Sequence, residues 1–106
     1  MQTTPENDPE LRSKINRETA RLAWSELLKY FASGNMVCVA NELDLVDVAM
    51  RVSHDDKASI AAWMGAGQVA KVSDEQAQAW LAADTALWAV VVSPFILVQQ
   101  GKATVH

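Results

Sequence analysis

Cysteine and long apolar runs are scarce in this 106-residue chain. The single cysteine, Cys38, cannot form a disulfide within the chain, so nothing indicates an oxidising compartment. The longest apolar stretch, 86–98, is interrupted by Ser93 and Pro94, and it is shorter than the about 20 residues that a membrane-spanning helix needs. The first residues are polar and lack the basic and apolar segments of a signal peptide. We therefore expect a cytoplasmic protein with no membrane contact.

Positively charged residues are fewer than negatively charged ones, because the chain has 9 Lys and Arg but 13 Asp and Glu, a formal net charge of −4. This balance disfavours non-specific attraction to nucleic acid or to anionic membranes. Apolar residues make up 50% of the chain and charged residues 21%, which is typical of a globular protein rather than a disordered one. The length predicts one domain.

Motifs for catalysis and cofactor binding are missing as well. No serine lies in a Gly-x-Ser-x-Gly context. Gly65-Ala66-Gly67 follows an expected helix and precedes an expected strand, the reverse of a dinucleotide-binding fingerprint. Cys38 lies between two valines, which supply none of the positive charge that activates a thiol, so we predict a buried, unreactive side chain. We therefore expect no cofactor and no catalytic residue.

Local patterns predict a succession of helices and short strands. Asp8 and Pro9 are typical of a helix start, and apolar residues continue on one face to Phe31, with a break near Trp24-Ser25 as an alternative. Ser73 begins a capping box for a later helix. The predicted elements begin with a helix over 8–33 and a strand over 36–40. A helix to residue 52, with Asn41 and Asp44 as alternative caps, and a helix over 55–64, with Asp55 as its cap, follow. The last elements are a strand over 68–72, a helix over 73–84 and an extended segment over 87–100.

This order predicts an α+β fold with four or five helices and a small, mostly antiparallel sheet. A single domain is expected over 8–100, between a disordered leader at 1–7 and a frayed tail at 101–106. The order of helix, strand, helix pair and β wing also matches a winged helix, in which the helix over 73–84 would enlarge the wing. Element order alone does not separate these two architectures.

The segment 87–98 is the most apolar part of the chain. Val90, Val91 and Val92 favour extended structure and lack polar alternation, which predicts a strand covered on both faces. Either the chain's own helices cover both faces, or a second subunit covers one of them. Pro94 cannot donate to a strand ladder, so it marks a bulge, an edge or a turn between two strands.

Three segments resemble a known family of short bacterial proteins, namely 18–21 with 24–27, 43–49 and 88–94 (ETAR with WSEL, LDLVDVA and WAVVVSP). The chain resembles this family, domain of unknown function 2288, from about Leu11 to Gln100. The resemblance implies a bacterial source and a single-domain protein. It implies no activity and transfers no functional residue.

The sharpest polar cluster is His54-Asp55-Asp56, with Asp44 and Asp47 one helix earlier. Carboxylates and an imidazole that converge could bind a divalent metal or serve a small enzyme. Neighbouring residues on a turn usually point apart, however, and acids at these positions routinely cap helices. We therefore expect no metal site, and an enzyme with His54, Asp44 and Asp47 is the least favoured hypothesis.

Tryptophan is enriched at protein interfaces and is seldom fully buried. Trp63 and Trp80 point inward by helical phase, whereas Trp24 and Trp88 lie at element boundaries and are candidates for an exposed partner contact. The favoured hypothesis is a non-catalytic interaction module that binds a protein partner or forms a homodimer. The alternative is a winged-helix-like nucleic-acid-binding protein with a recognition helix near 56–64, although its acidic start opposes contact with phosphate.

Overall fold

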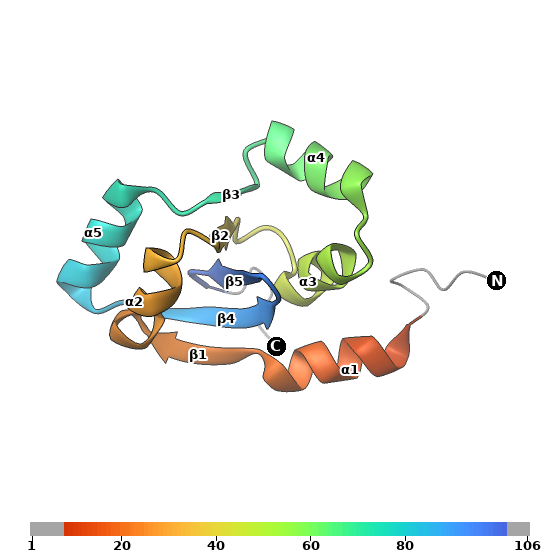
Figure 1. Ribbon diagram of the computed structural model, residues 1–106, viewed down its shortest axis with the longest axis horizontal. Coiled ribbons are helices and arrows are strands. Elements are labelled where there is room, and N and C mark those ends of the chain that lie inside the picture. Colours follow the sequence, from red (N-terminus) through yellow and green to blue (C-terminus); the bar gives the residue numbers. More distant parts are fainter. Residues whose placement is uncertain (1–7, 102–106) are drawn as a thin grey trace.

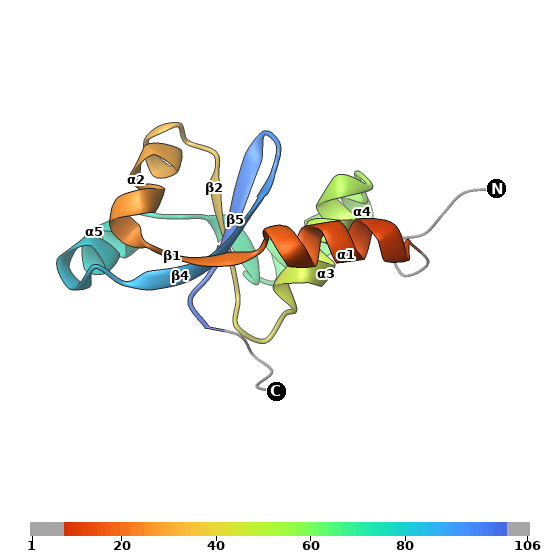
Figure 2. The same cartoon turned by 90° about the horizontal axis from the view of Figure 1, so that it is seen from below.

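The computed structural model of the protein describes residues 8–101, which form a five-stranded mixed sheet with helices on both faces (Figures 1 and 2). The sheet order is β1-β4-β5-β2-β3, and three of its four pairings are antiparallel. The elements are α1 (Pro9–Glu18), β1 (Ala20–Ala23), α2 (Trp24–Ala32), β2 (Met36–Val39), α3 (Leu45–Ser53), α4 (Lys57–Gly65), β3 (Val69–Lys71), α5 (Asp74–Ala83), β4 (Ala86–Val92) and β5 (Phe95–Gln99). This confirms the predicted α+β class. The predicted leader at 1–7 and the tail at 102–106 lie outside the described residues.

The long helix predicted at the start of the chain is interrupted by a strand. Thr19 ends α1, since both its backbone N–H and its hydroxyl donate to the Ile15 carbonyl, at 2.9 and 2.8 Å. The next four residues pair with β4, from Ala20 opposite Ala89 to Ala23 opposite Ala86. The helical spacing of apolar residues therefore continues through a segment that tertiary pairing holds extended. Ala23 rather than Ser25 is the N-cap of α2.

The C-terminal segment forms a hairpin, so Pro94 lies in a turn between two strands, one of the predicted alternatives. β5 also pairs in parallel with β2, which in turn pairs with β3. β2 thus lies between β3 and the hairpin. A winged helix would pair residues 68–72 with the C-terminal strands in a single wing, and this wing does not form.

Two apolar clusters cover the two faces of the sheet. α1 and α3 pack on one face, where they meet Val90 and Leu97, and we call this the first core. α2 and α5 pack on the other face, where they meet Leu87 and Ile96, and we call this the second core. Because successive strand residues point to opposite faces, the hairpin feeds both cores. The predicted burial of this segment on both faces is confirmed.

Val91 is the exception, because its side chain is 50% exposed. It lies near the hairpin turn, two residues beyond Ala89, the last β4 residue that pairs with β1. Val91 is therefore not covered by the chain's own helices, since the hairpin extends beyond its neighbouring strand, and its cover by a second subunit stays a prediction.

Candidate functional site

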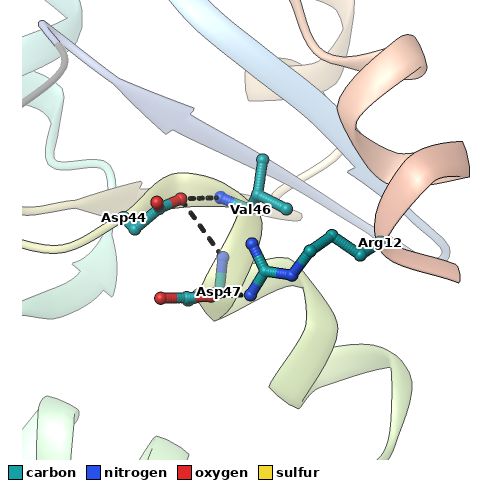
Figure 3. Close-up of polar contacts among 4 residues, drawn as sticks. All are labelled: Arg12, Asp44, Val46 and Asp47. Carbon is teal, nitrogen blue, oxygen red and sulfur yellow. Dashed lines mark hydrogen bonds and ion pairs between the residues drawn. The ribbon is translucent and has the colours of Figure 1, made fainter. Parts of the chain in front are cut away.

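Two carboxylates at the start of α3, Asp44 and Asp47, hold that helix in place. Asp44 is the N-cap of α3, and its Oδ1 accepts from the backbone N–H groups of Val46 and Asp47, at 2.8 and 3.4 Å. The Asp47 carboxylate in turn pairs with the Arg12 guanidinium of α1 (Figure 3). Both acids therefore have structural partners, as the capping interpretation predicts for Asp44.

His54 lies at the opposite end of α3 as its C-cap. Its Nε2 is 3.2 Å from Oδ2 of Asp8, whose other oxygen accepts from the Leu11 N–H and caps α1. A nine-residue helix separates His54 from Asp44, which amounts to roughly 13 Å at 1.5 Å per residue. The sequence-predicted cluster of His54, Asp44 and Asp47 therefore does not converge. Within residues 8–101 no group of three or more His, Cys, Asp or Glu side chains is placed to hold a metal.

Asp56, and not the predicted Asp55, caps α4. Its carboxylate accepts from the Ser59 N–H and hydroxyl and pairs with the Arg51 guanidinium at 2.8 Å. The bond from Arg51 and then those from Ser59 lower the pKa of the Asp56 carboxyl. Asp55 instead forms the turn before it, with a positive φ of 55°. Aspartate tolerates this left-handed conformation better than most residues, so Asp55 occupies the turn and Asp56 provides the cap.

The burial of the four tryptophan side chains differs in part from the prediction. Trp24 is 0% exposed, with its ring centroid 5.6 Å from that of Trp80, so the expectation of an exposed contact at Trp24 is wrong. The strand at 20–23 causes this, because it turns α2 onto the second core. Trp80 is buried as predicted, and Trp63 is only partly buried against the first core. Trp88 is partly buried beneath the Arg21 guanidinium, 5.7 Å from the ring centroid.

Cys38 is partly buried against the second core. Burial raises the pKa of its thiol, and a weak bond from the Gln76 amide, 3.8 Å from Sγ, opposes this shift. A raised pKa keeps the thiol protonated near neutral pH, and the protonated form is a poor nucleophile.

Helix α4 is the one helix within residues 8–101 that has no buried residue. Its sequence, Lys-Ala-Ser-Ile-Ala-Ala-Trp-Met-Gly, places apolar residues around the helix rather than on one face, and none of the nine residues is buried. Met64 is 56% exposed. In Figure 1, α4 lies above the end of the sheet and leads directly into the edge strand β3. An apolar helix normally buries at least one face, so α4 leaves apolar surface without cover.

An apolar groove of about 280 Å³ lies beside α4, and we call it the α4 groove. Val37, Phe95 and Leu97 of the sheet line it on one side, and Val48 and Val52 of α3 line a second. Ile60 and Met64 of α4 and the three residues of β3 complete it. Lys71 is the one charged residue of this lining.

The geometry explains why this groove was not predicted from the sequence. Its lining comes from five elements that are distant along the chain, and it combines three buried, four half-buried and three exposed residues. The available signal was the even distribution of apolar residues around α4, which is unusual for a helix at a protein surface. We had predicted this helix to turn an inward face to the core.

Comparison with known proteins identifies the family but no activity. The family described as "Protein of unknown function (DUF2288)" matches residues 10–100. The chain is 41% identical to the protein in "NMR solution structure of PA1075 from Pseudomonas Aeruginosa", with 92% of each chain covered and a TM-score of 0.77. No curated protein matches. No helix within residues 8–101 is long and apolar enough to cross a membrane. The chain belongs to the DUF2288 family, as the three sequence segments predicted.

Proposed function

We propose that the protein is a small interaction module, and that the α4 groove receives apolar side chains from a segment of a partner protein. The observation that carries this proposal is that α4 buries none of its nine residues although it borders a groove with an apolar lining. Peptide segments commonly bind by placing a few apolar side chains in such a groove.

The groove has the properties that favour a protein segment as its occupant. Its volume of about 280 Å³ is at the lower limit for sites that enclose a small molecule, so it suits two or three side chains better than a whole cofactor. Met64 and Ile60 offer flexible and aliphatic contacts that adapt to different side chains. The edge strand β3 adds backbone groups at the border of the groove.

A nucleic-acid partner is less well supported at α4. This helix carries one basic residue, Lys57, whose ammonium group is 3.9 Å from the Asp55 carboxylate. Asp56 lies at its N-terminus. An α-helix that reads DNA relies on basic and amide side chains for phosphate and base contacts, and α4 presents mainly alanine and larger apolar side chains.

Two matched variants test the proposal. Met64 and Leu81 are exposed to nearly the same extent, 56% and 58%, but Met64 lines the groove and Leu81 lies on α5 at the other end of the molecule. Tagged wild-type protein, Met64→Asp and Leu81→Asp are used for affinity capture from the native cell. We expect a discrete protein to be captured by the wild type and Leu81→Asp and lost with Met64→Asp.

The opposite pattern, with capture lost only for Leu81→Asp, would place the binding surface on α5 and contradict the proposal. Capture that is equal for all three proteins, or no discrete captured protein, would also contradict it. Sedimentation velocity on the purified proteins tests whether the occupant is a second copy of the chain. A wild-type dimer that becomes a monomer in Met64→Asp would show that a second copy fills the groove.

A further inference from the structure

A second groove, of about 640 Å³, is lined by α1, the end of α3 and the hairpin. α1 lines it through Leu11, Lys14 and Glu18, and the hairpin lines it through residues 91–93. Val52 lines both grooves, and the hairpin also contributes Phe95 and Leu97 to the α4 groove. Together they form one surface around the end of α3 and the hairpin turn, which we call the two-groove surface.

The charge of this surface differs in sign from that of the protein. The chain carries a net charge of −4, whereas the charged residues that line the two grooves are Lys14, Lys71 and Glu18. Both lysine side chains are exposed, and within residues 8–101 neither ammonium group has an ion-pair partner. The exposed Val91 adds apolar area between them.

We infer that the partner segment is acidic as well as apolar, with carboxylates that pair with Lys14 and Lys71 while its apolar side chains occupy the grooves. This inference rests on the proposed function and adds the chemistry of the partner. An acidic segment is otherwise repelled by the net charge of the protein, so a local positive surface decides where it docks. The lysines lie at the margin of the apolar lining, where charges set register and specificity.

Selection from a library of random 12-residue peptides displayed on phage tests the inference with the full 106-residue chain. We expect selected peptides to combine apolar residues with Asp and Glu, to lose binding to Met64→Asp and to keep binding to Leu81→Asp. The double variant Lys14→Glu/Lys71→Glu should weaken their binding by roughly tenfold or more, since each reversal removes an attraction and adds a repulsion at an exposed site. Selection against that double variant should favour basic peptides.

A matched double variant controls for net charge. Arg21→Glu/Lys29→Glu changes the total charge equally, but these residues lie on β1 and α2 and neither lines either groove. Its affinity for the selected acidic peptides should stay within about twofold of the wild-type value at physiological salt, because distant exposed charges are screened there. Circular dichroism of every variant verifies that it is folded.

The outcomes separate this inference from the proposed function. Peptides that require Met64 but show no acidic bias, or whose bias is unchanged by Lys14→Glu/Lys71→Glu, would overturn the acidic partner and leave the groove as the binding surface. An equal loss of binding in both double variants would overturn it too, because net charge alone would then explain the preference. Peptides that bind independently of Met64, or no selected peptide at all, would overturn the proposed function itself.

Discussion

Helices α4 and α5 are alike in sequence but differ in what they cover. They have 9 and 10 residues, and each carries a tryptophan followed by a large exposed side chain, Trp63-Met64 in α4 and Trp80-Leu81 in α5. Trp80 is 5% exposed in the second core, where α2 packs beside α5, whereas Trp63 is only partly buried. The composition of a helix therefore does not determine how much of it is buried. α5 buries Ala77 and Trp80, whereas α4 buries no residue and borders an open groove.

The largest expected effect separates the two tryptophans. Trp80→Ala should lower the free energy of unfolding by about 3–5 kcal/mol, because it removes a buried ring and leaves a cavity. Trp63→Ala should cost about 1–2 kcal/mol, a common value for a substitution at a partly covered site. Urea denaturation with matched m-values measures both. Equal losses in the free energy of unfolding would show that the two helices are equally well packed, which would contradict the difference between α4 and α5.

A smaller effect is expected at Gln99, which holds the loop before α3, the helix that lines both grooves. The buried Gln99 amide donates to the carbonyls of Ala40 and Leu43, at 2.8 and 2.6 Å. Gln99→Leu should cost about 1–3 kcal/mol, since it removes the donor that two partly buried carbonyls share. The adjacent, exposed Gln100→Leu is the control and should stay within about 0.5 kcal/mol of the wild type. Equal stability of the two variants in thermal or urea unfolding would mean that this loop does not fix α3.

A pH-dependent effect is expected at the start of α4. Because its bonds to Arg51 and Ser59 lower the pKa of Asp56 in the folded state, the ionised carboxyl stabilises the fold above the unfolded pKa of about 3.9. This contribution is lost as the pH falls through the lower, folded pKa. Asp56→Asn should therefore be less stable than the wild type at pH 7, and the two stabilities should converge below about pH 3. A difference that is the same at pH 7 and pH 3 would contradict the assigned cap.

The matched surface variants should leave stability almost unchanged. Met64→Asp and Leu81→Asp each alter a side chain that is more than half exposed, so both should remain within about 0.5 kcal/mol of the wild type. Thermal unfolding by circular dichroism measures this. A large loss for Met64→Asp alone would mean that α4 belongs to the core.

No measurable effect is expected with generic duplex DNA. The net charge of −4 and the acidic start of α4 predict negligible affinity at physiological salt. Fluorescence anisotropy with a labelled duplex measures it. Salt-sensitive retention in the micromolar range, reduced by Lys57→Ala, would restore the winged-helix hypothesis.

Local rules were sufficient where one short segment decides the structure. The capping box of Ser73 and Gln76, the strand at 36–39 and the turn at Pro94 all follow from neighbouring residues, and the structure confirms them. The strand at 20–23 could not be predicted in this way, because its pairing with β4 overrides a helical apolar pattern. The burial of Trp24 follows from that strand.

The candidate site was less predictable than the fold. Absence of a catalytic motif directed the prediction to protein binding, but the predicted contact Trp24 is buried, and the contact proposed for Trp88 stays a prediction. The α4 groove depends on how far α3 and α4 extend over the sheet, which is set by packing between distant elements and not by any local pattern.

Photo-crosslinking in the native cell tests the central claim most directly, because it reports contact at a chosen side chain. A photo-reactive amino acid is placed at position 64 in one variant and at position 81 in another, the two sites of nearly equal exposure. The account predicts a discrete crosslinked protein from position 64, of a mass other than that of a second copy, and none from position 81. Crosslinks from position 81 alone, or none from position 64, would contradict the account.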